Sequence, residues 1–326
     1  MAMPLGGRGA PHRPVLLRET ISLLAPERGG LFVDGTVGLG GHSEALLNAS
    51  PATRVIGIDL DSESLELVRE RLAPFGERFR AVQANFREMA RVLEQAGEQD
   101  ASGILVDLGV SSLQLDSPQR GFSFRFEAPL DMRLDARGSG PTAADLLREL
   151  SEEEIARILF EYGEERRSRR IARRIVERRL AGKPLASTSD LAEVVASAVG
   201  YSKAQKIHPA TRTFQALRIA VNQELDGLDR FIGTAIDLLQ PDGRFAAISF
   251  HSLEDRIVKQ ELRRLSGFCQ CPPRLPVCSC GARQTVEILT RRPVTAGPTE
   301  LAENPRARSA KLRACRKLSS NQAGSV

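Results

Sequence analysis

The sequence predicts an α/β fold: a mostly parallel, doubly wound sheet that carries an inserted all-α domain. Short apolar runs at Gly30–Val33, Val55–Ile58 and Gly103–Leu108 alternate with helix-like segments, which is typical of parallel sheets with helices on both faces. Each of these runs has an acid at its end, where ligands of such sheets bind. The alternation stops near Leu115 and resumes after Ala216, which indicates a helical insertion.

The individual elements before the insertion follow from apolar periodicity and from Pro and Gly punctuation. Pro74, for example, is expected to stop the helix whose apolar face carries Leu65, Val68 and Leu72. We expect helices at 16–25, 62–72 and 87–95, a further helix after His42, and strands at 30–33, 55–58, 79–84 and 103–108.

The insertion itself is predicted to hold helices at roughly 142–182 and 188–199, followed by a loop through His208 and Thr213. After it we expect a long helix at 219–239, a strand at 244–250, a helix at 253–265 and a closing antiparallel pair at 285–289 and 311–318. The predicted organisation is a flexible N-terminus at 1–12, the sheet domain at 13–114 and 216–318, the insertion at 115–215, and a flexible tail at 319–326.

The composition is mildly basic and arginine-rich. The formal net charge is +5, and 40 of the 46 basic residues are arginines. Such a balance favours nucleic acid as a partner without requiring it, and a genomic bias toward arginine explains most surface positions. No apolar run approaches 18 residues and 1–13 lacks a signal-peptide core, so we expect a soluble, cytoplasmic protein with no membrane partner. The sequence is compatible with a monomer and with a homodimer.

The segment from Phe32 to His42 predicts a cofactor site. An apolar strand ends at Asp34, and glycines follow at 35, 38, 40 and 41 before a helix begins. In such a turn, backbone N–H groups can approach a ligand closely. Asp59, at the end of the next strand, is placed to accept hydrogen bonds from a ribose. These residues therefore predict a nucleoside-bearing cofactor.

The glycine spacing favours S-adenosyl-L-methionine over other nucleoside cofactors. It differs from the dinucleotide fingerprint, and no Lys-Ser or Lys-Thr pair follows for a triphosphate. Asp34 would repel a phosphate but could hold the ammonium of an amino acid. Two alternatives stay open: a nicotinamide-dependent oxidoreductase would also use this turn and Asp59, and a non-catalytic RNA-binding protein would explain the basic segment described below.

Eight specific segments follow one another along the chain. They are Asp34-Gly-Thr-Val-Gly-Leu-Gly-Gly-His42, Asp107-Leu-Gly-Val-Ser-Ser112, Arg120-Gly-Phe-Ser-Phe124, Pro129-Leu-Asp-Met-Arg133, Tyr162-Gly-Glu-Glu-Arg166, His208-Pro-Ala-Thr-Arg-Thr-Phe-Gln215, Ser249-Phe-His-Ser-Leu-Glu-Asp-Arg256 and Glu303-Asn-Pro-Arg-Ala-Arg-Ser309. From His12 to about Arg316 the chain thereby resembles the MraW family of 16S ribosomal RNA cytosine-N4 methyltransferases. The resemblance implies a class I S-adenosylmethionine-dependent methyltransferase fold. It also implies methyl transfer to the exocyclic N4 amine of a cytidine in the decoding region of 16S rRNA, within the small ribosomal subunit.

The resemblance also implies which residues line the cofactor pocket. The glycine turn and the positions of Asp59 and Asp107 at strand ends predict the same cofactor contacts independently of the resemblance. His42 lies near a helix start, where an imidazole stays neutral, so we interpret it as a backbone-positioning contact and not as a base. The implied set is Gly40, Gly41, His42, Asp59 (ribose), Phe86 (adenine), Asp107 and Gln114.

The catalytic residues are less clearly marked. An acceptor for the amine proton would assist transfer, because the cytosine nitrogen is a poor nucleophile. DNA amine methyltransferases place an acid or amide, two prolines and an aromatic after the fourth strand; here Asp107-Leu-Gly-Val-Ser-Ser112 stands there instead. Alignment alone could supply much of the rate, and helix capping would explain the serines equally well. The candidates for catalysis are Asp107, Ser111, Ser112 and His251.

RNA is expected to bind the insertion. Between Arg166 and Lys183 nine basic residues accompany one acid, with apolar residues at helical spacing, a pattern that suits phosphates although it also fits a merely solvated face. A neighbouring loop interleaves arginines and phenylalanines, as base stacking would require, although part of it could be core. The candidate RNA contacts are Arg120, Phe124, Arg169, Arg170, Arg173, Arg174 and Arg212.

Four cysteines suggest a structural zinc site. They form two C-x-C pairs, Cys269 with Cys271 and Cys278 with Cys280. In a cytoplasmic protein, clustered thiols favour a tetrathiolate zinc over disulfides, but the usual C-x2-C spacing is absent and methyl transfer needs no metal. Cys315 has no partner of this kind and is expected to be buried.

Overall fold

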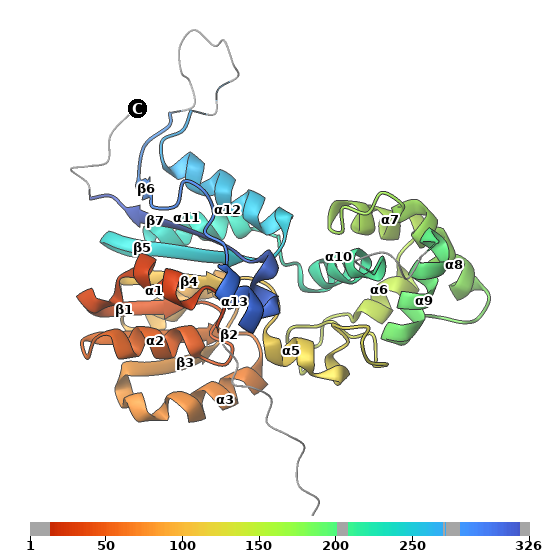
Figure 1. Ribbon diagram of the computed structural model, residues 1–326, viewed down its shortest axis with the longest axis horizontal. Helices are drawn as coiled ribbons and strands as arrows, with labels where there is room; N and C mark the ends of the chain where they lie inside the picture. The colour runs from red at the N-terminus through yellow and green to blue at the C-terminus, as the bar shows by residue number, and fades with distance from the viewer. Residues whose placement is uncertain (1–13, 201–207, 270, 272–280, 320–326) are drawn as a thin grey trace, which may run out of the picture. The chain divides into compact units, whose positions relative to one another are not determined.

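A computed structural model describes residues 14–200, 208–269, 271 and 281–319 (Figure 1). The chain divides into two compact units, 1–109 with 227–326 and 110–226, each described here by itself. The sequence predicts the boundaries between these units at 114/115 and 215/216, whereas the units of the structure meet at 109/110 and 226/227. Within the described ranges, no helix combines the length and apolar character needed to cross a bilayer.

The first unit is built on a mixed sheet with the strand order β3-β2-β1-β4-β5-β7-β6 (Figure 1). Strands β1 to β5 are parallel neighbours, whereas β7 is antiparallel to both β5 and β6. The predicted doubly wound sheet and its closing antiparallel pair are therefore confirmed. The strands are β1 Gly30–Asp34, β2 Thr53–Asp59, β3 Phe79–Gln83, β4 Ala101–Asp107, β5 Leu239–Ser249, β6 Val286–Ile288 and β7 Lys311–Lys317.

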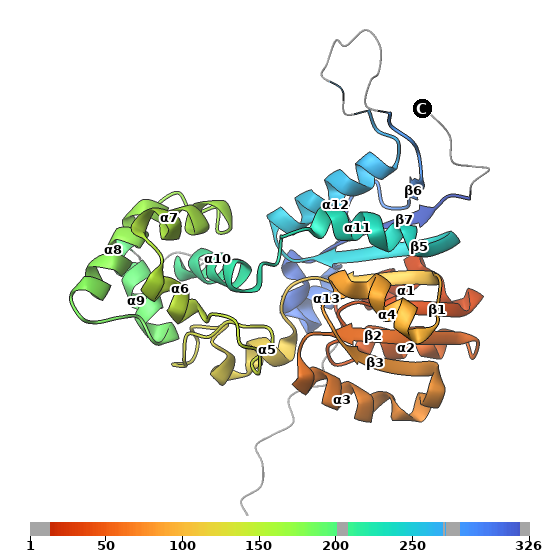
Figure 2. The same cartoon turned by 180° about the vertical axis from the view of Figure 1, so that it is seen from behind.

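Helices cover both faces of this sheet because the inner strands are apolar on both sides. One face carries α1 Leu17–Leu24, α2 Gly41–Ala49 and α3 Ser62–Leu72, which pack through residues such as Leu46, Leu65 and Val68. Figure 2 shows the other face, covered by α4 Met89–Ala96, α11 Leu228–Asp237 and α12 Ser252–Leu265.

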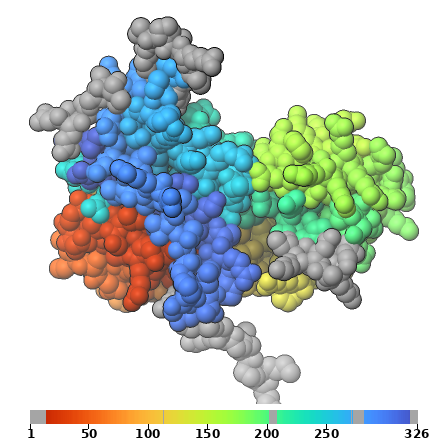
Figure 3. All heavy atoms as spheres, turned by 45° about the horizontal axis from the view of Figure 1, so that its top comes forward, coloured from red at the N-terminus to blue at the C-terminus, as the bar shows by residue number. Residues whose placement is uncertain are grey.

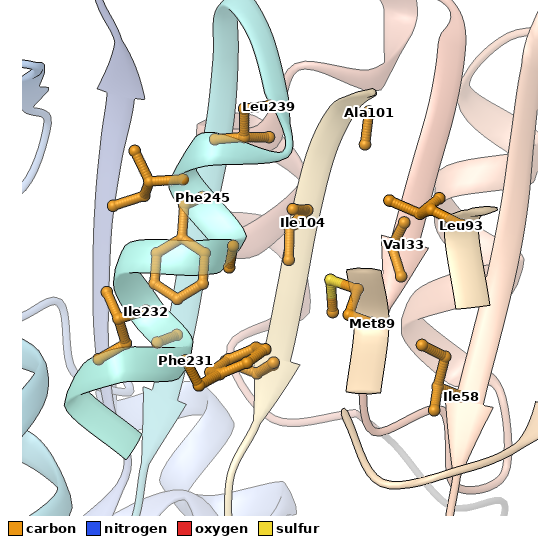
Figure 4. Packing of buried hydrophobic residues seen from close by; sticks show 14 of the residues in the cluster. Val33, Ile58, Met89, Leu93, Ala101, Ile104, Phe231, Ile232, Leu239 and Phe245 are labelled. Atoms are coloured by element: carbon orange, nitrogen blue, oxygen red, sulfur yellow. The ribbon is translucent and has the colours of Figure 1, made fainter. Parts of the chain in front are cut away.

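The core on that second face is shown in Figure 4. Phe231 and Ile232 of α11 and Met89 of α4 lie over strand residues such as Ile104 and Phe245, all at most 4% exposed. At roughly 25 cal/mol per Å² of apolar surface, each such side chain contributes about 2 kcal/mol. This packing fixes the strand ends that carry the acids.

The C-terminal segment of the first unit folds back onto its beginning. Helix α13 Pro298–Glu303 places Glu300, whose carboxylate accepts a hydrogen bond from the backbone of Leu16 at 2.7 Å. Figure 3 shows this blue C-terminal part lying against the red N-terminal part. The remaining short elements are the 3-10 turns η1 Pro26–Arg28, η2 Ala73–Arg78, η3 Phe86–Glu88 and η5 Pro305–Ser309.

The second unit is helical in its described part, as predicted. Helices α7 to α10 pack around a single apolar core through residues such as Leu159, Ile171 and Leu217. Its elements are α5 Ser112–Asp116, η4 Pro118–Arg120, α6 Ala143–Glu149, α7 Glu152–Glu161, α8 Ser168–Leu180, α9 Thr188–Val199 and α10 Ala210–Asn222.

Two element predictions were wrong. The long helix expected at 219–239 is interrupted, because Gln223 takes a left-handed conformation that ends α10 and Gly227 takes another before α11 begins. Thr213, expected in a loop, lies inside α10, which begins three residues earlier. A buried apolar face that includes Phe214 and Leu217 stabilises that helix.

Candidate functional site

Three acids of the first unit lie at one edge of the sheet. Asp34 ends β1, Asp59 ends β2 and Asp107 ends β4. Because these strands are parallel neighbours, their carboxyl ends share an edge, and ligands of such sheets bind there. The structure thus brings the predicted strand-end acids to the same side of the unit.

The glycine turn between β1 and α2 is held by one of these acids. The backbone N–H of Gly38 donates to Oδ2 of Asp59 at 2.8 Å. Gly40 takes a left-handed φ of 78° as the N-cap of α2, and a Cβ there would lie 2.4 Å from the Val68 side chain. Any larger residue at this position would be strained and would push the turn away from α3.

Asp34 is buried beneath this turn. Its Oδ2 accepts the Ser43 hydroxyl at 2.7 Å and its Oδ1 accepts the Thr36 N–H at 3.3 Å. Burial raises the pKa of Asp34 from 3.8 to about 6, against the lowering effect of these two hydrogen bonds. The site therefore keeps an acid whose charge is costly to maintain.

Asp59 has a similar environment at the tip of β2. Its second oxygen accepts the Asp61 N–H at 2.9 Å, and burial raises its pKa to about 6. A carboxylate offers about four acceptor positions, and the backbone N–H groups of Gly38, Leu60 and Asp61 use part of them. Acceptor capacity thus remains for hydroxyl groups of a ligand.

Asp107 differs because one of its oxygens has no hydrogen-bond partner among the described residues. Its N–H donates to Oγ1 of Thr36 at 2.6 Å, which fixes the strand tip. Its Oδ1 is buried and accepts no hydrogen bond from any described residue. Burial, and then the charges of Asp34 and Glu254, raise the pKa of Asp107 well above the ordinary value. A buried acceptor of this kind is available to a donor from water or from a ligand.

His251 follows β5 at the same edge, as the N-cap of α12. The Glu254 N–H donates to its Nδ1 at 3.4 Å, so the ring proton belongs on Nε2, which lies 3.1 Å from Oε1 of Glu254. Nδ1 is therefore engaged within the turn, whereas Nε2 is buried and forms no hydrogen bond with a described residue.

His42 and Phe86 also have protein partners in the first unit. Nε2 of His42 lies 3.0 Å from the Val15 carbonyl and ties the N-terminal segment to α2. A Cβ on Gly41 would lie 2.2 Å from Pro14 of that segment. Phe86 packs edge-on against Phe231, with ring centroids 4.7 Å apart, and the Arg87 guanidinium lies over its ring.

Ser111, Ser112 and Gln114 open the second unit, at the start of α5. The Ser111 hydroxyl accepts the Gln114 N–H at 3.2 Å, and the Gln114 side-chain oxygen accepts the Ser111 N–H at 2.8 Å. This reciprocal pair is a capping box. The amide nitrogen of Gln114 donates to the Leu134 carbonyl at 3.2 Å, so the side chain is buried and fixed.

The arginine-rich segment forms the predicted amphipathic helix α8. Ile171, Ala172 and Ile175 are buried on one side. On the other side Arg169 and Arg170 are exposed and form no ion pair with a described residue. Arg173 and Arg174 are exposed and paired with Glu152 at 3.6 Å and Glu177 at 3.0 Å. Pairs this exposed are weak and can exchange for phosphates.

The other RNA candidates have contrasting surroundings within the second unit. Arg120 is 6% exposed, and its guanidinium donates to the Leu134 carbonyl at 2.6 Å. Phe124 stacks near His208 and Phe214, with centroids 4.8 and 5.1 Å away. The Arg212 side chain is 58% exposed and lies 4.0 Å from Glu165. Of these, Arg212 presents the most accessible charge.

The cysteines give an incomplete picture of the predicted zinc site. Cys269 is exposed and Cys271 half-buried, and the Cys271 N–H donates to Sγ of Cys269 at 3.4 Å. Cys278 and Cys280 lie outside the described residues, so the structure offers no zinc site to evaluate. Cys315 is buried in β7, as expected, and burial raises the pKa of its thiol to about 12.

Sequence reasoning missed two residues of the first unit, Thr36 and Glu254. Thr36 lies inside the glycine turn and accepts the Asp107 N–H. Glu254 is 1% exposed and holds the tip of β5. The His-x-x-Glu spacing from 251 to 254 is that of a capping box, and this signal could have identified Glu254.

A family model described as the MraW methylase family matches residues 9–318. The chain belongs to the MraW methylase family. The family that the eight motifs predicted is thereby confirmed, and the oxidoreductase and the non-catalytic RNA-binding alternatives lose their support.

Several relatives in this family cover nearly the whole chain. A protein named "Ribosomal RNA small subunit methyltransferase H" from Geobacter sulfurreducens is 55% identical over 94% of this chain and 99% of its own length. Proteins of the same name from Gloeobacter violaceus (53%, 95% of this chain, 90% of theirs) and Heliobacterium mobile (50%, 94% and 99%) are similar. Solved structures are more distant: an rRNA methylase from Streptococcus thermophilus has a TM-score of 0.40 and 11% identity, over 95% of this chain and all of that one.

Proposed function

We propose that this MraW-family protein transfers a methyl group from S-adenosyl-L-methionine to the exocyclic N4 amine of a cytidine in the decoding region of 16S rRNA. Relatives about 50–55% identical over 94% of the chain bear a small-subunit ribosomal RNA methyltransferase name. The eight motifs support the finer assignment to the cytosine amine. The structural observation that carries the proposal is the buried, unpartnered Oδ1 of Asp107 at the sheet edge.

The residues at this edge fit the cofactor. Bound S-adenosylmethionine supplies an activated methyl group and needs a ribose acceptor and close backbone donors, but no phosphate site. Asp59 retains acceptor capacity for ribose hydroxyls, and the glycine turn that it holds through Gly38 lies at the same edge of the sheet. Asp34 beneath the turn disfavours phosphates.

The remaining cofactor contacts are proposed by family resemblance. Phe86 would lie against the adenine, with its ring supported by Phe231. His42 would act through the backbone that it positions, because its ring contacts the Val15 carbonyl. Gln114 would complete the pocket from the start of α5, where its capping box holds it rigid.

The proposed chemical role of Asp107 follows from the substrate. A cytosine amine has two protons and a delocalised lone pair, so an acceptor on one N–H increases the nucleophilicity of the nitrogen. Asp107 offers a buried acceptor with increased proton affinity. As the N4–methyl bond forms and the methyl–sulfur bond breaks, one N4 proton would pass to Oδ1 of Asp107. Ser111 and Ser112 are proposed only to orient the base.

The proposed RNA surface is the exposed side of α8, together with Arg212. Arg169 and Arg170 are free of ion pairs among the described residues, so phosphates would not have to displace a carboxylate there. Phe124 would contribute through the loop that it anchors. Arg120 is committed to backbone carbonyls and would shape that loop instead of contacting RNA.

The decisive experiment uses the full chain with tritiated S-adenosylmethionine and either bare small-subunit rRNA or 30S particles. We expect one labelled cytidine whose digested nucleoside co-migrates with N4-methylcytidine. Asp107→Asn serves as the reduced-activity control. Label on a different base or atom would refute the assignment of the amine. Tight binding of NAD without S-adenosylmethionine binding would refute the cofactor.

A further inference from the structure

Glu254 is a buried carboxylate that the preceding role assignments leave unused. It lies in the first turn of α12 and is 1% exposed. Its Oε2 accepts the Phe250 N–H at 2.9 Å, and its Oε1 lies 3.1 Å from Nε2 of His251. Burying a carboxylate costs several kcal/mol unless its partners compensate, so a neutral glutamine, which also suits the third position of a capping box, would hold the turn at lower cost.

The position of Glu254 relates it to Asp107 through the sheet. Asp107 pairs with Ile248 of β5, and the Leu108 N–H donates to the Ile248 carbonyl at 2.9 Å. Phe250, whose N–H Glu254 accepts, follows two residues later. Glu254 is therefore anchored to the strand tip on one side of β4.

Asp34 lies on the opposite side of β4 from Glu254. It ends β1, the other neighbour of β4, and Thr36 of the following turn accepts the Asp107 N–H. Asp107 thus lies between the tip of β1, which ends in Asp34, and the tip of β5, which Glu254 holds through the Phe250 N–H. We propose that Glu254 is a positioning residue for methyl transfer: it fixes the β5 tip and, with Asp34, places negative charge on both sides of Asp107, which makes Asp107 a stronger proton acceptor.

Charge and hydrogen bonding support this inference, which rests on the proposed function of Asp107. The charged groups of the first unit that raise the pKa of Asp107 are Asp34 and Glu254, after burial itself. The neighbouring His251 lies against Glu254 at two points: its Nδ1 accepts the Glu254 N–H, and its Nε2 lies 3.1 Å from Oε1. Two like charges disfavour a third, so the proton released by the amine is retained more readily on Asp107.

The test compares two substitutions of Glu254 that separate its charge from its shape. Single-turnover methyl transfer is measured at saturating cofactor and RNA across pH 5–9. Glu254→Gln removes the charge, and we expect the acid limb of the rate profile to move to lower pH by roughly one unit. Glu254→Asp keeps the charge, and we expect an unmoved limb even if the maximal rate falls.

Glu261→Gln is the matched control, because it removes the same charge from the same helix, where Glu261 pairs with Arg264. Its acid limb should match that of the parent. The charge of the cofactor is common to all four proteins and cancels in the comparison. A Glu254→Gln profile that superposes on the parent profile would overturn the inference, as would an equal shift in Glu261→Gln.

A second measurement guards against a Glu254→Gln protein that does not fold. In the parent enzyme labelled with ¹³C at aspartate carboxyls, the Asp107 signal, assigned by its loss in Asp107→Asn, should titrate above the ordinary range of aspartate. Titration within the ordinary range would contradict the inference. Failure of the proposed function would show instead in the identity of the methylated nucleoside, which neither measurement depends on.

Discussion

Replacing Asp34 by Asn should stabilise the protein, because it removes a buried charge while keeping its shape. Asp34 is 2% exposed and accepts hydrogen bonds from the Ser43 hydroxyl and the Thr36 backbone. An asparagine oxygen can still accept the Thr36 N–H, and the Ser43 hydroxyl can rotate to accept from the new amide. The substitution therefore leaves the hydrogen-bond geometry around residue 34 nearly unchanged.

The magnitude follows from the pKa of Asp34. Burial raises that pKa from 3.8 to about 6, so the folded state binds the proton more tightly than the unfolded chain does. The free energy of unfolding of the parent therefore falls as pH rises through that window, by about 3 kcal/mol in total. Below about pH 4 both states are protonated and the cost vanishes. At pH 7.5 Asp34→Asn should be more stable than the parent by about 2–3 kcal/mol. The gain is below about 3 kcal/mol because a neutral amide forms weaker hydrogen bonds with Ser43 and Thr36 than a carboxylate does.

Urea unfolding followed by far-UV circular dichroism at pH 4, 5, 6 and 7.5 tests this expectation, as the chain has no Trp. Asp100→Asn, at an exposed aspartate of the same unit, is the matched control and should change stability little at any pH. The reasoning fails if Asp34→Asn is no more stable than the parent at pH 7.5. It also fails if the difference between the two does not shrink toward pH 4.

The same variant should bind the cofactor more weakly. If the Asp34 carboxylate compensates the positive charge of S-adenosylmethionine, a neutral amide loses that attraction while gaining stability. Such an opposition between stability and function is common at active sites. Calorimetric titration of the parent and Asp34→Asn with S-adenosylmethionine at pH 7.5 measures it, and an unchanged affinity would limit Asp34 to a structural role.

Three further predictions concern the proposed sites. Asp59→Ala should weaken S-adenosylmethionine binding by about ten- to a hundredfold, and it should also loosen the turn that Asp59 holds through Gly38; unchanged calorimetric affinity would remove it from the site. Asp107→Asn should reduce the saturating single-turnover rate by about a hundredfold or more; a rate within about threefold of the parent would move the chemistry to alignment alone. Neutralising the exposed arginines of α8 should weaken RNA binding and flatten its salt dependence with unchanged cofactor affinity, and an unaltered salt slope would show a merely solvated face; these are Arg169, Arg170, Arg173 and Arg174.

The sheet and its strand-end acids could be predicted because they depend on local sequence patterns. An apolar run that ends in an acid, as at Ile58 and Asp59, predicts both the strand and the residue at which it ends. The break after α10 was missed because the left-handed residue that ends the helix is Gln223, where a glycine would be usual. Only the following Asp226-Gly227 pair signals a turn there.

The partners of charged side chains could not be predicted from the sequence. Arg169 and Arg179 belong to the same arginine-rich run, yet Arg169 is exposed while the Arg179 guanidinium donates to the carbonyls of Leu147, Arg148 and Leu150. Glu254 likewise reads as an ordinary helix-start acid. What distinguishes such residues is their tertiary contacts with residues tens of positions away in the sequence, and local periodicity contains no information about those contacts.

The position of β7 has a consequence for the synthesis of the chain. Among the described strands it is the last to leave the ribosome, yet it lies between β5 and β6 in the sheet, and α13, which precedes it, holds the Leu16 backbone through Glu300. Until residues 311–317 emerge, the outer edge of β5 is unpaired and β6 has no neighbour. Open edges of this kind recruit strands from other chains. A nascent or prematurely terminated chain that stops before residue 311 would therefore be a substrate for chaperones and proteases, although Asp34, Asp59 and Asp107 had already been synthesised.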